Sequence, residues 1–107
     1  SNNEISDISP LARLVNLTEL WLDRNRFQDL RPLAALTKLK ELNTEANAVQ
    51  DLAPIGELSE LECLRADDNR IADVSPLVNL AKLCVLYLSQ NALTDYKHNH
   101  EIHLIFQ

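Results

Sequence analysis

Glycine is nearly absent from this chain of 107 residues, which has one, Gly56, and no methionine. Tight turns usually rely on glycine, so a chain with many turns must build them from other residues. Blocks of basic residues are also missing: ten Lys and Arg face sixteen Asp and Glu, and the net charge is −6. This balance argues against a nucleic-acid partner and against an anionic membrane surface.

Long apolar runs and paired cysteines are lacking too. The longest apolar run, residues 83–88, is far too short to span a bilayer, so no membrane insertion is expected. Cys63 and Cys84 are too few for a disulfide framework and lack zinc-site spacing, which predicts free thiols. Unpaired thiols slightly favour the cytoplasm, and a secreted or cell-surface bacterial setting stays open. Because the chain starts with Ser1 and shows no signal peptide, we expect a processed or trimmed piece of something longer.

A repeat of 22 residues runs through the chain. Full copies occupy residues 17–38, 39–60 and 61–82, a half copy precedes them at 1–16, and a degenerate copy follows at 83–107. The copies share the frame L-x-x-L-x-[L/T/A]-x-x-N-x-[I/F/V/L]-x-D-[L/I/V]-x-P-[L/I]-x-x-L-x-x. Asn, Asp and Pro therefore supply the turns, and the whole chain is expected to form a single repeat domain.

Two architectures combine such a period with regular prolines: an array of amphipathic helices, and a solenoid with one short strand per coil. In a helix the apolar residues recur at intervals of three and four, but Leu20 and Leu22 are two apart, as in a strand. The next apolar residues, from Phe27 to Leu36, are spaced by threes, which suits 3₁₀ turns. Pro32 stands where such a turn begins. The pattern predicts the solenoid.

The frame resembles the leucine-rich repeat of the 22-residue class, which includes bacterial internalin-type proteins and regulatory subunits of protein phosphatase 1. The resemblance covers nearly the whole chain. It implies an α/β solenoid, a right-handed coil with a parallel sheet on its concave face and 3₁₀ turns on its convex face. It also implies a protein-interaction module, without identifying the partner.

Two polar residues recur once per coil and are expected to serve the coil itself. The Asn column lies where the chain leaves the strand, and a buried amide there can satisfy backbone groups of its own coil and the next one. The Asp column precedes the convex turn, where a carboxylate can accept from exposed backbone N–H groups. The columns are Asn3, Asn25, Asn47, Asn69 and Asn91, and Asp7, Asp29, Asp51, Asp73 and Asp95.

The sixth position of the repeat departs from leucine in the middle of the chain. It holds Leu22 and Leu88 in the outer copies, but Thr44 and Ala66 in the two between. Either neighbouring side chains fill the space, or the core is thin there, which would cost stability. Both interpretations are open from the sequence.

All three histidines, His98, His100 and His103, fall in the degenerate last copy. They lie on its expected convex turn, where His98 takes the place of the repeat proline. The stretch lacks the H-E-x-x-H spacing of a metal site, and terminal repeats are commonly atypical. We therefore expect an irregular terminal coil, no metal and no other cofactor.

No catalytic constellation is visible, because the seryl hydroxyls have no histidine in a neighbouring coil and no Gly-rich phosphate loop occurs. Instead of an enzyme, the sequence predicts binding on the concave sheet, whose outward positions carry seven acidic and three basic residues. Trp, Tyr and Arg are enriched at interface hot spots, so the expected partner is a protein or peptide with a basic surface. The predicted contact residues are Trp21, Asn43, Arg65 and Tyr87 in a central column, flanked by Glu19, Asp23, Glu41, Glu45 and Asp67.

The alternative function is that of a structural or assembly segment of a longer repeat array, with no ligand of its own. The half copy has no strand, so the strand at residues 20–22 would be an open sheet edge, which invites self-pairing. Self-association through uncapped ends is therefore also expected.

Overall fold

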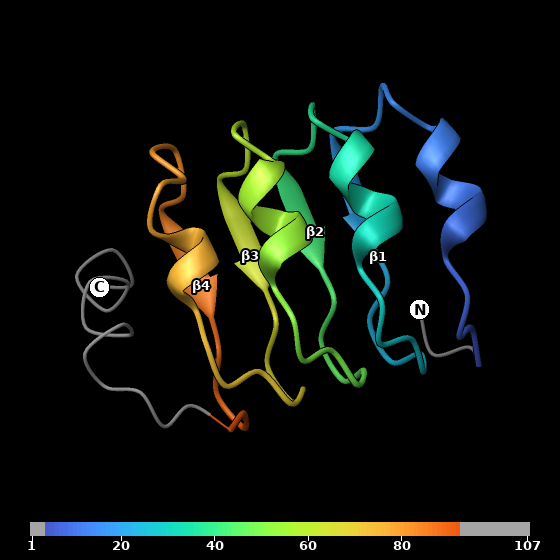
Figure 1. Ribbon diagram of the computed structural model, residues 1–107, viewed down its shortest axis with the longest axis vertical. Coiled ribbons are helices and arrows are strands. Elements are labelled where there is room, and N and C mark those ends of the chain that lie inside the picture. The colour runs from blue at the N-terminus through green and yellow to red at the C-terminus, as the bar shows by residue number, and fades with distance from the viewer. Residues whose placement is uncertain (1–3, 93–107) are drawn as a thin grey trace.

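Each of the three full repeats, residues 17–38, 39–60 and 61–82, forms one coil that contains a short strand and a 3₁₀ helix, as Figure 1 shows. The computed structural model describes residues 4–92, so the predictions for Asn3, Asp95 and the three histidines lie outside the described residues. The strands are β1 (Glu19–Trp21), β2 (Glu41–Asn43), β3 (Cys63–Arg65) and β4 (Val85–Tyr87). The 3₁₀ helices are η1 (Ser9–Arg13), η2 (Arg31–Ala35), η3 (Ala53–Glu57) and η4 (Ser75–Leu77). The predicted leucine-rich-repeat solenoid is confirmed.

The four described strands form one parallel sheet in the order β1-β2-β3-β4. Every pairing has a shift of 22 residues: Leu20 lies beside Leu42, and Leu64 lies beside Leu86. The 3₁₀ helices stack as a second layer on the other side of the molecule (Figure 1). Within the described chain β1 pairs with β2 alone, so it is an edge strand, as the sequence predicted.

The 3₁₀ helices begin as the repeat predicts. Each has its proline at the first or second position. A backbone N–H there has no acceptor within the helix, so proline loses no hydrogen bond. Each is preceded by an aspartate whose Oδ1 accepts a 2.9 Å hydrogen bond from the backbone N–H two residues further on. The expected role of the Asp column is confirmed for Asp7, Asp29, Asp51 and Asp73.

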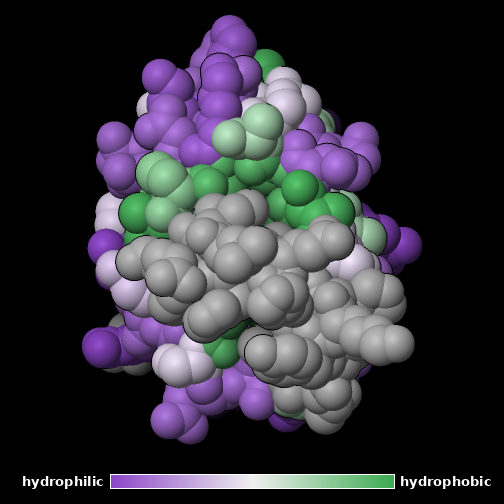
Figure 2. Space-filling view, turned by 90° about the vertical axis from the view of Figure 1, so that its left-hand side faces the viewer, coloured by the Kyte–Doolittle hydropathy of each residue, from purple (hydrophilic) through white to green (hydrophobic). Residues whose placement is uncertain are grey.

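The hydrophobic core lies between the sheet and the 3₁₀ layer, and each coil covers the next. Leu33, Ile55 and Leu77, which hold the same repeat position, are 0% exposed. Figure 2 views the solenoid from its C-terminal end, where hydrophobic side chains gather towards the middle and hydrophilic ones lie around the rim. Thr44 and Ala66 are also 0% exposed, and the Thr44 hydroxyl donates to the Arg65 carbonyl over 3.3 Å. Neighbouring coils thus cover both small residues completely.

The Asn column links adjacent coils. From the sequence we expected each asparagine to bond to the next coil, but in the structure it bonds to the preceding coil. Asn69 Nδ2 donates to Ala66 O and Asp67 O in its own coil, at 3.1 Å each. It also donates to Thr44 O of the preceding coil at 2.9 Å, and its Oδ1 accepts from Val49 N at 3.0 Å.

The turn after each strand needs a left-handed backbone, and the chain makes it without glycine. The residue immediately before each repeat asparagine has a φ between 58° and 60°. These residues are Arg24, Ala46, Asp68 and Gln90. A side chain in this region costs about 1–2 kcal/mol, so the asparagine hydrogen bonds must hold the turn in place.

Candidate protein-interaction face

The strand register brings the predicted contact residues into three columns on the concave face. Trp21, Asn43, Arg65 and Tyr87 are directly paired along the sheet. Glu19 and Glu41 continue as Cys63 and Val85 in a second column. Asp23, Glu45, Asp67 and Ser89 follow the strands at the same repeat position and form a third. Side chains alternate along a strand, so the leucine between the first two columns points into the core.

The two aromatic residues of the central column are large and exposed. Trp21 is 48% and Tyr87 38% exposed, although both belong to the sheet. They lie three strand spacings apart, about 14–15 Å. Between them the Arg65 guanidinium carbon lies 4.9 Å from the centre of the Tyr87 ring, a cation–π distance. This contact restricts the conformations of both side chains.

Asn43 holds its predicted place in the central column but differs from its three neighbours in exposure. Its side chain is only 9% exposed. Its Oδ1 accepts a 2.9 Å hydrogen bond from the backbone N–H of Glu45, which pulls the short side chain down onto the sheet. The larger Trp21 and Arg65 stand on either side. Asn43 therefore forms the floor between them.

The acidic residues surround this column and differ in how firmly they are held. Asp67 Oδ1 accepts a 2.7 Å hydrogen bond from the backbone N–H of Ser89 in the next coil. Glu19 and Glu41 are exposed on the neighbouring strands, and Glu45 is half-buried. Carboxylates spread over one face attract a basic partner over a distance of about a Debye length, 8–10 Å at physiological salt.

The cysteines are free thiols, as predicted, with Cys63 half-buried and Cys84 exposed. Burial raises the pKa of the Cys63 thiol above its ordinary value, although Arg65 lies near enough to counter part of the shift. The thiolate is the reactive form, so a raised pKa makes Cys63 a poor nucleophile. In residues 4–92 no group of three or more His, Cys, Asp and Glu side chains could hold a metal ion. No helix in that range has the length and apolarity to cross a membrane.

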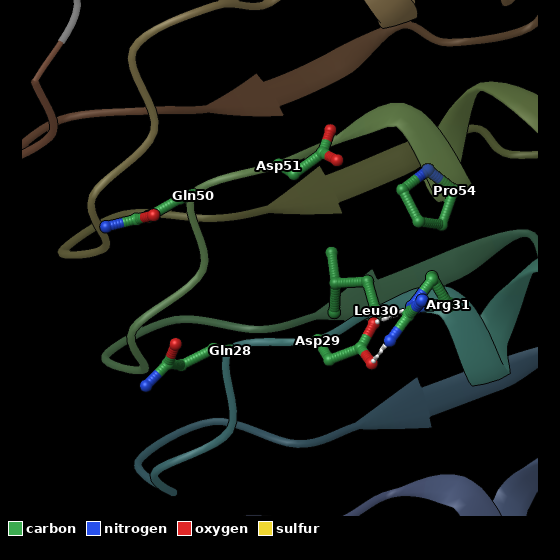
Figure 3. A pocket seen from close by; sticks show the side chains of 7 residues that line it. All are labelled: Gln28, Asp29, Leu30, Arg31, Gln50, Asp51 and Pro54. Carbon is green, nitrogen blue, oxygen red and sulfur yellow. Dashed lines mark hydrogen bonds and ion pairs between the residues drawn. The ribbon is translucent and has the colours of Figure 1, made fainter.

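A hollow of about 350 Å³ lies away from the concave face, where two coils enter their 3₁₀ helices (Figure 3). Its polar groups already serve the fold. Asp29 accepts from the Arg31 side chain at 2.8 Å and from the Arg31 backbone N–H at 2.9 Å, while Asp51 accepts from the backbone N–H of Ala53. Both carboxylates belong to the column that caps every coil, so the concave face remains the candidate site.

Comparison with known proteins agrees with this geometry. A family model described as leucine-rich repeats (two copies) matches residues 1–35 and 15–57, more than half of the chain. The chain belongs to the leucine-rich-repeat family. A search of curated proteins found no match.

Solved structures place this leucine-rich-repeat protein close to the internalins. Internalin C2 of Listeria monocytogenes is 45% identical with a TM-score of 0.86, over 90% of this chain and 42% of that one. A second Listeria internalin, inlF, is 32% identical with a TM-score of 0.87, over 92% of this chain and 29% of that one. A leucine-rich-repeat protein of Leptospira interrogans has a TM-score of 0.84 at 24% identity, over 97% of this chain and 27% of that one, and shows the fold alone.

This chain spans less than half the length of the internalins it matches. Internalin-like leucine-rich repeats are protein-interaction modules in general, and the present chain has that character. The strand register brings the residues of the predicted central column together, and Asn43 is the one among them that is nearly buried. The repeat already made Arg65 and Tyr87 neighbours, but the stacking of the guanidinium on the ring is visible only in the structure.

Proposed function

We propose that the concave face binds another protein through Trp21, Arg65 and Tyr87. The observation that carries the proposal is the exposure of Trp21 and Tyr87 in one column of a sheet. Large aromatics left in water cost free energy that a partner recovers on binding, and such residues dominate measured interfaces. The spacing of about 14–15 Å suits a helix or loop laid across the four strands.

The acidic columns favour a partner with a basic or mixed surface. Glu19, Glu41 and Glu45 flank the aromatic anchors on both sides. Rim charges of this kind change the association rate and its salt dependence more than the lifetime of the complex. The likeness to Listeria internalins favours a bacterial source over the phosphatase-subunit setting.

Peptides selected on the wild-type chain from a phage-displayed library test this proposal. Trp21→Ala and Tyr87→Ala should each weaken the selected peptides by about 30-fold, which corresponds to about 2 kcal/mol per buried anchor. Their melting temperatures should stay near that of the wild type, because both side chains lie outside the core. Glu57→Ala, on the exposed convex side, is the matched control and should change nothing. Peptides that lose affinity only with Glu57→Ala would refute the concave assignment.

The alternative function, a structural segment of a longer array, has one observation in its favour. At the N-terminal end of the solenoid Ile5, Leu14 and Val15 are 41–47% exposed. At the position of Leu14, later coils hold Leu36, Leu58 and Leu80, all at most 2% exposed. This end is an apolar stacking surface beside the open edge of β1, and we propose that a second copy can cover it.

Sedimentation equilibrium distinguishes this assembly from a monomer. The wild-type chain should associate as its concentration rises, and Leu14→Glu should abolish the association by placing a charge on the stacking surface. Thr37→Glu adds the same charge to an exposed site in the interior of the array and should leave the association intact. A wild-type chain that is monomeric at all concentrations would rule out self-association.

A further inference from the structure

The concave face contains a small hollow between Trp21 and Arg65. Its volume is about 40 Å³, and it is lined by Trp21, Glu41, Leu42, Asn43, Cys63 and Arg65. One water occupies about 30 Å³ in the liquid, so the space suits the polar end of a single side chain and nothing larger. The chemistry of its walls therefore decides which side chain of a partner can enter.

The floor offers a hydrogen-bond donor that the fold does not use. The Glu45 backbone N–H fixes the Asn43 amide with Oδ1 as its acceptor, so Nδ2 carries the two remaining donors. Within the described chain Nδ2 has no partner, and water can reach this atom although the residue as a whole is only 9% exposed. By contrast, Nδ2 of the buried Asn69 donates to three carbonyls. A group of the partner that supplies an acceptor can therefore replace water on this donor.

The walls add more donors, one acceptor and a flat apolar surface. Arg65 stacks on Tyr87 and forms no ion pair within residues 4–92, so its guanidinium keeps N–H groups to donate. Glu41 supplies an exposed carboxylate as the acceptor. Trp21 closes the hollow with an aromatic ring on which a planar group can stack.

Neither kind of charged side chain matches this set. A carboxylate would satisfy Asn43 and Arg65 but would stand next to Glu41 on a face that carries a net negative charge. An ammonium group would satisfy Glu41 but would leave the Asn43 amide unsatisfied and face the Arg65 guanidinium. A primary carboxamide is planar and neutral, and it offers an oxygen to the donors and an NH₂ group to the carboxylate.

We propose that this hollow is a specificity subsite for a neutral amide of the partner, the carboxamide of a glutamine or asparagine side chain. The inference rests on the proposed function, because it assigns a ligand group within the same face. The aromatic anchors then supply most of the affinity, and the hollow selects which residue of the partner lies between them. A site built to hydrogen-bond a polar group rejects analogues that leave its own polar groups unpaired.

Small-molecule probes test the subsite on the full chain without any protein partner. Trp21 is the only tryptophan, so its fluorescence and its indole N–H resonance report on the hollow specifically. Titration at constant ionic strength with acetamide, sodium acetate and methylammonium chloride compares the three chemistries. N-methylacetamide is a fourth probe, which mimics a main-chain peptide group. Acetamide should give a saturable shift in the millimolar range, at least about tenfold tighter than the two ions and tighter than N-methylacetamide.

Two variants and a control complete the test. Asn43→Asp keeps the acceptor for the Glu45 N–H but removes the two donors of the amide. It should weaken the binding of acetamide by about tenfold and make the hollow prefer methylammonium. Glu41→Gln should weaken the binding of acetamide relative to that of acetate. Because Glu41 is exposed, this variant remains a test even if Asn43→Asp fails to fold. Asn79→Asp, the same substitution on the exposed convex side, should leave every titration unchanged.

The results separate this inference from the proposed function. Acetate or methylammonium binding as tightly as acetamide, or no saturation by acetamide, would overturn the amide assignment. A preference for N-methylacetamide would overturn the side-chain source in favour of a main-chain one. In each of these cases selected peptides could still lose affinity with Trp21→Ala and Tyr87→Ala, and the concave assignment would stand.

Discussion

The single glycine offers a test in which two physical effects have opposite signs. Gly56 lies in η3, and its φ is not positive. Replacing such a glycine with alanine normally stabilises a protein by about 0.4–1 kcal/mol, because the unfolded chain loses freedom. In this structure, however, a Cβ at Gly56 would lie 2.9 Å from the backbone carbonyl oxygen of Pro76 in η4. Real Cβ atoms essentially never approach another heavy atom so closely.

The contact should outweigh the gain in chain entropy. The obstacle is backbone, so η3 and η4 must move apart by several tenths of an ångström to reach an ordinary contact of 3.4 Å or more. Both helices pack on a core in which Ile55 and Leu77 are 0% exposed, so the movement loosens that core. Overpacking of this kind typically costs about 1–3 kcal/mol. Each kcal/mol lowers the melting temperature of a domain this size by about 4–8 °C.

Urea unfolding and thermal unfolding followed by circular dichroism measure the effect, and an unchanged m-value would confirm that stability alone has changed. Ala34→Gly calibrates the conformational contribution, because Ala34 holds the same repeat position in η2. Alone it should cost about 0.5–1 kcal/mol. If Gly56→Ala raises the stability by as much as Ala34→Gly lowers it, the close approach does not constrain the coils and the reasoning is wrong.

Three further predictions concern residues that recur in every coil. Asn69→Ala should lower the unfolding free energy by about 1–3 kcal/mol, because the buried Val49 N–H loses its acceptor and the carbonyls of Thr44, Ala66 and Asp67 each lose one of two hydrogen bonds. Asn79→Ala on the surface should cost under about 0.5 kcal/mol in urea unfolding. Ala46→Gly should raise the melting temperature, because glycine adopts the φ of 59° without steric strain. The relieved strain outweighs the added entropy of the unfolded chain by up to about 1 kcal/mol. A lower melting temperature would show that Ala46 is not strained. Asp29→Asn should destabilise the protein at pH 7 but progressively less in urea unfolding between pH 5 and pH 2. The Arg31 side chain and backbone N–H hold the pKa of Asp29 below its ordinary value, so its stabilisation is present above the unfolded-state pKa and disappears as the pH falls through the lower folded-state pKa.

Much of the concave face followed from the period, since residues 22 apart must become neighbours once a strand is assigned to each coil. That reasoning placed Trp21 and Tyr87 correctly in one exposed column. It did not show that Asn43, at an outward position of the same column, is nearly buried. A short side chain between a tryptophan and an arginine bonds to the nearest backbone N–H, and only the three-dimensional arrangement of those neighbours shows it.

The sequence alone determined the architecture, because every coil repeats the same requirements. Its strand must alternate, its 3₁₀ turn must begin with Asp and Pro, and its amide must link two coils, so one period recurring along the chain predicts all of them. The tertiary structure decided what depends on distances between coils: the direction of the Asn69 bonds, the stacking of Arg65 on Tyr87, and the hollow above Asn43. These features arise where side chains of different size meet across the sheet, and packing, unlike periodicity, depends on the neighbours each residue acquires only when the coils close on one another.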